Sequence, residues 1–363
     1  MKKILLIGAT KLSYMPYAKF YLNQLSQLDV EVHLLLWQRD NIPDEVLPIN
    51  IITHRFIFPM EEQIPLYKKA KGYRKYRQYL IELFDRIYFD NLVVLYANAG
   101  ILISSLLKVK YKGRYILDYR DYSKGHSGVL RKRLWMLSRN SAVTFISSEG
   151  FRALLPLDVI IAVAHNIIHS DWENRLMPSN KKQNKPIRVS FWGFVRHEEY
   201  NRKLLQHFAN DERFVLHFYG KENSCTVGLI NYCKANNVEN VLFHGAYLPQ
   251  DRFEFAENTE IIHNIYGDDY NSNLLTSNKY YDGVLFYLPQ LCSKGSHMGE
   301  MVHEKSIGLA CDITSPCLAD EIYQYYTNIN WSQFYKNCNI EATRILNEYQ
   351  SSLLVMQQAL QNS

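Results

Sequence analysis

One segment of the chain, residues 278–300, carries a cation, a carboxylate and a glycine-rich turn at short, fixed offsets. Lys279 and Asp282 are three residues apart, so on a helix their side chains lie on one face. The turn contains Gly295, Gly299 and Glu300. The ammonium group and the backbone N–H groups of the turn would contact phosphate, and the carboxylate would accept hydrogen bonds from ribose hydroxyls. The pattern indicates a nucleotide site, although a lysine and an aspartate at this spacing also form ordinary surface ion pairs.

A second loop offers further cations for the same ligand. The apolar run 187–192 predicts a strand, Gly193 and Arg196 follow it, and Arg202 lies in the helical stretch beyond. A glycine at a strand end lets the backbone approach a ligand, and cations beside a helix start favour a diphosphate. The alternative is an ordinary connecting loop with surface arginines.

Several common catalytic motifs are absent from the sequence. Gly8-Ala9-Thr10 follows the first apolar run without completing GxGxxG, so a dinucleotide-dependent oxidoreductase is not favoured. Walker A, GxSxG and HExxH patterns are missing as well. His165 and His169 are four residues apart but have no third ligand nearby, so we expect no metal and no cofactor.

Alternating strands and helices must position these residues. In the first half of the chain, short apolar runs rich in β-branched residues are separated by helical stretches, which predicts a parallel sheet covered on both faces. We therefore expect an α/β, Rossmann-like domain over residues 1–176. Its predicted strands are 3–8, 30–37, 92–96, 115–117, 142–146 and 159–164, with a helix at 17–28.

A polar stretch, residues 177–186, then interrupts the pattern and is predicted to be an interdomain linker. A second αβ series predicts another Rossmann-like domain over residues 187–339. We expect the two doubly wound domains to face each other across a cleft, because such sheets bind ligands at the carboxyl ends of their strands. Residues 340–363, chiefly a long helix, are assigned to neither domain. The strands predicted in the second domain are 187–192, 214–219, 241–243, 260–265, 288–292 and 308–311.

The composition is that of a globular protein with two cores. The chain has 363 residues, of which 47% are hydrophobic and 21% charged. The N-terminal apolar run ends at Gly8 and is too short for a signal peptide, and no apolar stretch is long enough to span a bilayer. The six cysteines include no CxxC pair, which suits a reducing compartment. We therefore expect a cytoplasmic protein.

Positive charge gathers in one segment, although the net charge is only +5. Residues 68–77 contain six Lys and Arg residues beside apolar residues at helical spacing, which predicts a basic amphipathic helix. Such helices lie on anionic membranes, so we expect peripheral contact with the inner face of the plasma membrane. The alternative is a solvated helix face. Because the cations form clusters and not a long stripe, no nucleic-acid partner is expected.

The spacing within residues 278–300 is similar to that of the GT-B glycosyltransferases, specifically the family-4-like enzymes of bacterial capsular and surface polysaccharide biosynthesis. Asp282, Pro289 and Glu300 match, without a gap, the ribose-binding carboxylate, the strand-opening proline and the loop-ending glutamate of that family. Gly193 and Arg196 resemble its diphosphate-contacting loop. The resemblance extends to Asn278-Lys279, to the segment 144–151, to His165-Asn166, and to residues 118–121, which are similar to an acidic loop that faces the acceptor.

For the donor, the resemblance implies transfer of a sugar from a nucleoside diphosphate, with a UDP-sugar expected and the anomeric configuration retained. Arg196, Arg202 and Lys279 would neutralise the diphosphate leaving group. Asp282 would bind ribose, and the turn from Gly295 through Gly299 to Glu300 would contact phosphate and sugar.

For the acceptor, the resemblance implies a glycan or a lipid-linked saccharide bound mainly by the first domain. Gly8 would line the cleft there. Asp121 or His126 would orient or deprotonate the acceptor hydroxyl, and Asp121 is the first choice.

The chain also departs from the family pattern. Leu274 occupies the position of the first carboxylate of a Glu-x7-Glu pair, and Leu288 replaces a glycine. Asp268 or Asp269 could supply the missing acid. Two alternatives therefore stay open: a GT-B-like sugar-nucleotide epimerase, and a catalytically silent nucleotide-sugar-binding subunit.

Overall fold

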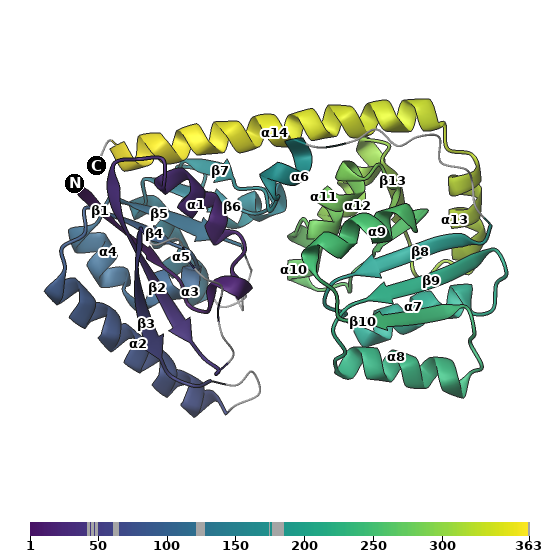
Figure 1. Ribbon diagram of the computed structural model, residues 1–363, viewed down its shortest axis with the longest axis horizontal. Coiled ribbons are helices and arrows are strands. Elements are labelled where there is room, and N and C mark those ends of the chain that lie inside the picture. Colours follow the sequence, from purple (N-terminus) through teal and green to yellow (C-terminus); the bar gives the residue numbers. More distant parts are fainter. Residues whose placement is uncertain are drawn as a thin grey trace. The chain divides into compact units, whose positions relative to one another are not determined.

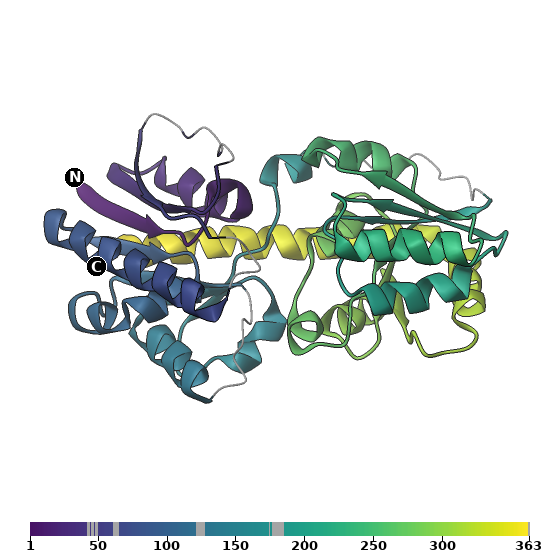
Figure 2. The same ribbon diagram turned by 90° about the horizontal axis from the view of Figure 1, so that it is seen from below.

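The computed structural model describes residues 1–41, 44, 47, 50–60, 65–120, 128–173, 175 and 185–361. The chain forms two compact units. Unit 1 comprises Met1–Asn166 together with Asn347–Ser363, and unit 2 comprises Ile167–Leu346. Each unit has one parallel sheet with helices on both of its faces (Figure 1, Figure 2). The predicted α/β class, with two Rossmann-like doubly wound domains, is confirmed.

The sheet of unit 1 has seven strands among the described residues, in the order β3-β2-β1-β4-β5-β6-β7, and all its pairs are parallel. In β1, Leu5, Leu6 and Ile7 are fully buried, as in a strand covered on both faces. Because β2 lies on one side of β1 and β4 on the other, the sheet has its topological switch point there. The strands are β1 (Lys2–Ile7), β2 (Val30–Gln38), β3 (Ile51–Ile57), β4 (Asn91–Val94), β5 (Tyr115–Tyr119), β6 (Val143–Ile146) and β7 (Ile161–Val163).

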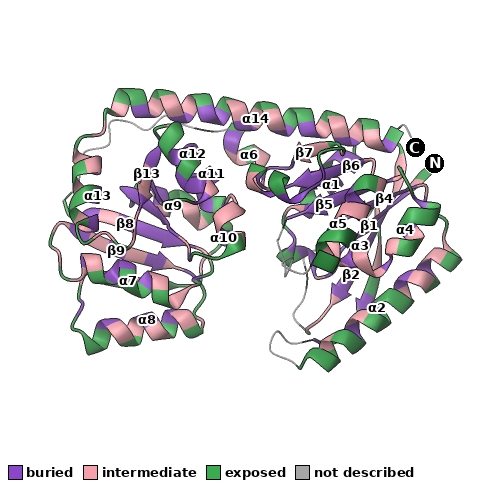
Figure 3. Cartoon of the chain, turned by 180° about the vertical axis from the view of Figure 1, so that it is seen from behind, coloured by how far each residue is buried: buried purple, intermediate pink, exposed green. Residues whose placement is uncertain are grey.

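The helices of unit 1 include α2, which carries the basic segment. In α2 the side chains of Tyr76, Leu80 and Leu83 are buried, while Lys68 and Lys71 are exposed (Figure 3). The predicted amphipathic helix is therefore present, with its cations on the solvent side. The helical segments are η1 (Leu12–Tyr14), α1 (Ala18–Leu25), α2 (Leu66–Arg86), α3 (Ala97–Leu102), α4 (Ser104–Lys110), α5 (Gly128–Asn140) and η2 (Glu149–Leu154).

Strand β3 is a feature that the sequence pattern did not predict. Its residues include Thr53, His54 and Arg55, so they do not form a continuous apolar run. The strand pairs with β2 alone at the edge of the sheet, and most of its side chains are partly exposed. An edge strand does not need two apolar faces, which explains why β3 lacks a continuous apolar run.

The sheet of unit 2 has six strands in the described part of the chain, in the order β10-β9-β8-β11-β12-β13, and all its pairs are parallel. On one face, Phe191 and Phe218 pack in a cluster with Leu204 of α7. On the other face, Trp192 and Ile262 pack with residues of α9 and of the segment before β12. The strands are β8 (Ile187–Trp192), β9 (Phe214–Tyr219), β10 (Val241–Gly245), β11 (Ile261–Asn264), β12 (Gln290–Ser293) and β13 (Gly308–Cys311).

The helical segments of unit 2 are mostly short. The glycine-rich turn of residues 295–300 runs into the first turn of α12, and the cation–carboxylate pair lies on α11. The segments are α6 (His169–Glu173), α7 (Glu198–Phe208), α8 (Ser224–Ala235), η3 (Pro249–Asp251), α9 (Arg252–Glu257), α10 (Tyr270–Leu274), α11 (Asn278–Leu285), α12 (His297–Glu304), α13 (Leu318–Thr327) and α14 (Trp331–Gln361). No helix among the described residues is both long and apolar enough to cross a membrane.

The unit boundary differs from the predicted division at residue 176, because α6 belongs to unit 2. Trp172 of α6 is buried in a cluster with Tyr280 and Tyr287, which ties the helix to unit 2. Most of the predicted linker, residues 177–186, lies outside the described residues.

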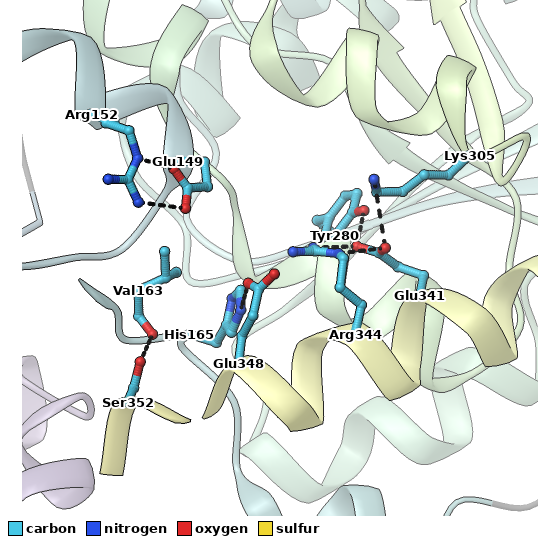
Figure 4. A network of polar contacts seen from close by, with 10 residues as sticks. All are labelled: Glu149, Arg152, Val163, His165, Tyr280, Lys305, Glu341, Arg344, Glu348 and Ser352. Carbon is cyan, nitrogen blue, oxygen red and sulfur yellow. Dashed lines mark hydrogen bonds and ion pairs between the residues drawn. The ribbon is translucent and has the colours of Figure 1, made fainter. Parts of the chain in front are cut away.

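The C-terminal helix α14, which the sequence left unassigned, contributes to both units. In unit 2, Glu341 accepts a hydrogen bond from the Tyr280 hydroxyl at 2.7 Å and pairs with Arg344 (Figure 4). In unit 1, Glu348 contacts His165 at 2.8 Å, and the Ser352 hydroxyl donates to the Val163 carbonyl at 2.6 Å (Figure 4). Unit 2 therefore extends beyond the predicted end at residue 339 to Leu346, and unit 1 includes the rest of α14.

Candidate functional site

The candidate site of unit 2 lies at the carboxyl ends of β8, β11 and β12. Strand β8 has β9 on one side and β11 on the other, so this edge holds the topological switch point of the sheet. Gly193, directly after β8, has a φ of 131°, which favours glycine. A Cβ atom on Gly220, directly after β9, would lie 2.1 Å from the Gly193 carbonyl oxygen. The backbones of the two loops therefore lie so close together that a side chain on Gly220 would not fit between them.

Lys279 provides a buried ammonium group at this edge. The residue is 5% exposed and lies in the first turn of α11. Its Nζ donates to the Tyr266 hydroxyl at 2.6 Å and lies 4.2 Å from the centroid of the Phe191 ring. A Cβ atom on Gly193 would be 3.8 Å from the same Nζ. Among the residues that the structure describes, no carboxylate lies within ion-pair distance of Lys279, although the charge of Lys279 acts on the buried Asp282 carboxylate of the same helix. The ammonium group therefore lacks the direct anionic contact that buried cations usually have.

Asp282 is buried on the same helix but is already engaged by protein donors. One carboxylate oxygen accepts from the Trp192 indole at 2.7 Å, and the other pairs with Arg252. Arg252 also pairs with Asp171 at 2.8 Å. Burial raises the pKa of Asp282, and the adjacent Arg252 guanidinium opposes that shift. Lys279 and Asp282 are thus not an exposed ion pair, and the ribose contact of Asp282 stays a prediction that would have to compete with these donors.

The two predicted arginines lie in different surroundings. Arg196 is exposed in the same loop as Gly193, with its guanidinium 5.5 Å from the centroid of the Phe194 ring. Arg202 lies on α7, where it pairs with Glu198 and stacks over Tyr232 of α8. The structure therefore keeps Arg196 beside Gly193, whereas the contacts of Arg202 turn it toward α8.

The glycine-rich turn leads into α12 and is joined to the Tyr266 loop. Ser296 caps the helix by accepting from the Gly299 N–H at 3.0 Å. A Cβ atom on Gly299 would lie 2.2 Å from the Ser293 carbonyl oxygen, so a larger residue does not fit there. The Ser293 hydroxyl accepts from the Tyr266 N–H at 3.0 Å and donates to the Tyr266 carbonyl at 2.9 Å. Gly295 has a φ of 77°, and Glu300 is exposed in the first turn of α12.

Sequence reasoning missed Tyr266 and His197, which complete the cluster. The His197 ring lies 6.5 Å from the Tyr266 ring, and its Nε2 is 3.6 Å from a carboxylate oxygen of Asp269. Gly267 leaves room for this histidine, because a Cβ atom there would lie 2.7 Å from His197 Nδ1. The residues come from separate loops, so no motif joins them. The only sequence signal was the polar run after β11, which contains both aspartates proposed for the missing acid.

A buried polar pair behind the site holds the loop that carries Arg196. Asn201 donates to the carbonyl oxygens of Arg196, at 2.6 Å, and of His197, at 3.2 Å. Its own amide oxygen lies 3.0 Å from His263 Nε2. The Ile265 N–H donates to the other ring nitrogen of His263, so the ring is held neutral, and burial lowers its pKa to about 3. The loop conformation thus depends on a neutral histidine in the core.

Leu274 stands at the position where the sequence resemblance implies an acid, and Asp268 and Asp269 are the proposed substitutes. Asp269 caps α10 by accepting from the N–H groups of Asn271 and Ser272, at 3.0 and 3.1 Å. Asp268 accepts from the Asn273 side chain at 2.7 Å, and Leu274 ends the helix. Both aspartates therefore act in the local structure of α10.

A cavity of about 280 Å³ adjoins the site. Val195 and Gly220 line it from the loops after β8 and β9, and Gly245 lines it from the end of β10. In the described residues, no group of three or more His, Cys, Asp or Glu side chains is arranged to hold a metal ion.

In unit 1, the predicted site residues fall partly outside the described chain. Asp121 and His126 lie outside the described residues. Gly8 is buried at the end of β1, where its carbonyl oxygen accepts from the Tyr76 hydroxyl at 2.6 Å and its N–H donates to Leu35 at 2.9 Å. A Cβ atom there would lie 2.5 Å from the terminal methyl of Met15, which can move, and 3.1 Å from the Leu35 carbonyl oxygen, which cannot easily do so.

Comparison with solved structures identifies the fold. Sucrose-phosphate synthase from Thermosynechococcus elongatus matches with a TM-score of 0.71 and 12% identity, over 99% of this chain and 98% of that chain. HepE from Anabaena, in complex with UDP and glucose, matches with a TM-score of 0.66 and 13% identity, over 98% and 100%. UDP-N-acetylglucosamine 2-epimerase from Rickettsia bellii matches with a TM-score of 0.59 and 9% identity, over the whole of both chains.

These similarities show that the chain has the GT-B fold. The identities are too low to show more than the fold. No protein-family model matches the sequence, and no curated protein matches it either.

Proposed function

We propose that this protein is a glycosyltransferase that takes a sugar from a nucleoside-diphosphate donor, a UDP-sugar in the first instance. The observation that carries the proposal is the buried ammonium group of Lys279, which has no carboxylate in direct ion-pair contact among the described residues. A buried cation of this kind is stabilised by an anionic ligand. A diphosphate bound beside Gly193 would supply that anion. The GT-B fold and the complex of HepE with UDP and glucose support this choice of ligand.

In the proposed reaction, Lys279 and Arg196 stabilise the negative charge that grows on the diphosphate as the bond to the sugar breaks. The buried ammonium is the stronger contributor, because charge interactions are less screened away from water. The bare backbone at Gly193 allows close approach of the phosphates. The first turn of α12, capped by Ser296, supplies further positive potential. These groups provide the charge, so the proposed mechanism uses no metal or organic cofactor.

Arg202, Asp282 and the turn from Gly295 to Glu300 keep their predicted donor contacts as secondary parts of the proposal. Asp282 has a further role that its geometry supports. By accepting from Trp192 and pairing with Arg252, it holds α11 against the end of β8 and against α9. It would therefore help to fix the position of Lys279.

We propose that the acceptor is a glycan or lipid-linked saccharide of surface polysaccharide synthesis, and that configuration is retained. Asp121 is the first choice to orient or deprotonate its hydroxyl and His126 is the second, and Gly8 is proposed to line the acceptor site. The exposed cations of α2 support a peripheral contact with an anionic membrane on the cytoplasmic side, where such an acceptor would be presented.

A second candidate function is epimerisation of a nucleotide sugar. The fold similarity to a UDP-N-acetylglucosamine 2-epimerase favours it, and it needs the same diphosphate site without an acceptor. A third candidate is a catalytically silent nucleotide-sugar-binding subunit, which Leu274 favours because it stands where an acid is expected.

The experiment that separates these functions begins with a thermal-shift screen of UDP-, GDP- and dTDP-sugars, because a ligand that binds only the folded state raises the melting temperature. The stabilising donor is then incubated with the protein without acceptor and analysed by mass spectrometry and NMR. An isomerised sugar nucleotide would establish the epimerase. If the nucleotide is released slowly and added glycan accelerates its release, the protein is a transferase. If the donor binds but neither reaction occurs, the protein is a catalytically silent binding subunit.

A further inference from the structure

Unit 1 contains a second buried cation with unused hydrogen-bond donors. Arg120 follows β5 directly and is 8% exposed. Its Nε donates to one carboxylate oxygen of Asp118 at 2.7 Å. Both Nη atoms are buried, and neither has an acceptor among the residues that the structure describes. Buried donors without an acceptor are rare in proteins, because each one loses its bonds to water.

Asp118 and Tyr17 hold the Arg120 guanidinium without using its Nη donors. Asp118, which also accepts from the Tyr21 hydroxyl, occupies only the Nε position. The ring of Tyr17 covers one face of the guanidinium at 4.3 Å. The two buried Nη atoms therefore remain as a planar fork, which is the geometry that binds both oxygens of a carboxylate or phosphate.

The position of the fork is also that of a ligand site. Tyr17 lies in the segment after β1, and its hydroxyl donates to the Leu95 carbonyl, directly after β4, at 3.0 Å. Arg120 follows β5, the next strand of the sheet. The stacked pair therefore lies at the carboxyl ends of β1, β4 and β5, at the topological switch point, where open α/β sheets bind ligands.

We propose that Arg120 is a binding residue for an oxyanion carried by the acceptor, either the carboxylate of an acidic sugar or the diphosphate of a lipid carrier. The oxyanion accepts from Nη1 and Nη2 together, while Asp118 and Tyr17 hold the guanidinium in place. Naming the anion as part of the acceptor rests on the proposed function, but the anion site itself does not.

The test is isothermal titration calorimetry with two anionic probes, methyl glucuronide and geranyl diphosphate, and with methyl glucoside as the neutral control. Titrations into the Lys279→Met variant avoid binding of the diphosphate probe at the donor site. One or both anions should bind this variant, and the probe that binds more tightly identifies the source of the oxyanion. Methyl glucoside should bind at least tenfold more weakly than methyl glucuronide if the sugar carboxylate is the ligand.

Replacing Arg120 alone would leave Asp118 buried and unpaired, which destabilises a fold strongly. The double change Asp118→Asn with Arg120→Gln removes both charges together. Made in the Lys279→Met background, it should weaken anion binding by roughly tenfold to a hundredfold, as expected for two charge-assisted hydrogen bonds. The matched control, Tyr21→Phe, removes a partner of Asp118 but leaves the fork and should keep the affinity. Melting temperatures report whether each variant folds.

Unchanged anion affinity in the double variant would overturn the proposal, as would the absence of anion binding by a folded Lys279→Met protein, since the fork would then bind water only. UDP binding separates the two proposals. The Asp118→Asn, Arg120→Gln protein with Lys279 intact should still bind UDP, whereas Lys279→Met should not. Loss of one ligand without the other shows which site has failed.

Discussion

The ammonium group of Lys279 donates a hydrogen bond of 2.6 Å to the hydroxyl of Tyr266. Lys279 lies in the first turn of α11, and Tyr266 is the second residue after β11. Tyr266 is itself fixed by two hydrogen bonds between its backbone and Ser293. The phenol therefore orients a cation whose charge remains available for a ligand.

Replacing Tyr266 by Phe should weaken UDP binding by about tenfold or less, because it removes an orienting hydrogen bond but keeps the ammonium group. Isothermal titration calorimetry with UDP measures the change. Tyr247→Phe, which alters another tyrosine of unit 2, is the control. A loss as large as that caused by removing Lys279 would mean that the hydroxyl itself contacts the ligand.

The two arginines of the second domain should behave differently. Arg196→Ala should reduce sugar transfer by about a hundredfold if its side chain stabilises the leaving group. Arg202→Ala should cause a clearly smaller loss, because Arg202 is a secondary contact that also pairs with Glu198 and stacks over Tyr232. Initial rates at saturating donor compare the two. Equal losses in both variants would make Arg202 a primary contact of the diphosphate, on a par with Arg196.

The buried histidines should make the folded state sensitive to acid. Burial lowers the pKa of His263 to about 3, below its value of about 6.5 in the unfolded chain. The unfolded state therefore binds more protons below pH 6.5, so stability falls as the pH falls. His263 alone should lower the free energy of unfolding by about 2 kcal/mol between pH 6.5 and pH 5.

Urea denaturation at the two pH values measures this difference. His263→Gln keeps a side-chain amide near Asn201 but cannot titrate, so its loss of stability between pH 6.5 and pH 5 should be smaller than that of the wild type. If both proteins lose the same free energy, His263 is not the responsible group. His54 and His217, whose pKa values burial lowers to about 4, would then be examined.

The basic helix α2 should bind anionic membranes. Changing Lys68, Lys69 and Lys71 to Gln should reduce co-sedimentation with phosphatidylglycerol vesicles at low salt, because each lysine near such a surface contributes about 1 kcal/mol. The control changes Lys108, Lys110 and Lys112, which removes the same charge elsewhere in unit 1. If both triple variants lose co-sedimentation equally, the net charge of the protein and not the position of α2 drives binding. If the α2 variant loses none, the contact between α2 and the membrane is excluded.

The sequence predicted the two sheets well because their central strands are buried on both faces and must be apolar along their whole length. The run at 187–192 coincides with β8, and the run at 30–37 lies within β2. Strand β3 was missed because an edge strand with exposed residues has no such requirement. The unit boundary was missed because the packing of Trp172 and the course of α14 depend on tertiary contacts between distant segments.

The candidate site could be predicted only where neighbours in sequence form it. The spacing of Lys279 and Asp282 on one helix was visible, but their partners were not. Arg252 pairs with Asp282 across 30 positions, and Tyr266 reaches Lys279 across 13. The folded arrangement of the loops determines which protein groups donate hydrogen bonds to the Asp282 carboxylate. It therefore also determines whether this carboxylate is free to bind ribose.

The most direct test of the central claim is the affinity of UDP for the wild type and for Lys279→Met, measured by isothermal titration calorimetry at 0.15 M salt with Lys203→Met as the control. Lys203 is an exposed lysine of α7 that pairs with Glu199. If Lys279 binds the donor diphosphate, UDP should bind the wild type and the control alike, and should bind Lys279→Met at least about a hundredfold more weakly, as loss of a buried charge partner implies. Equal UDP affinity in all three folded proteins would contradict this role of Lys279.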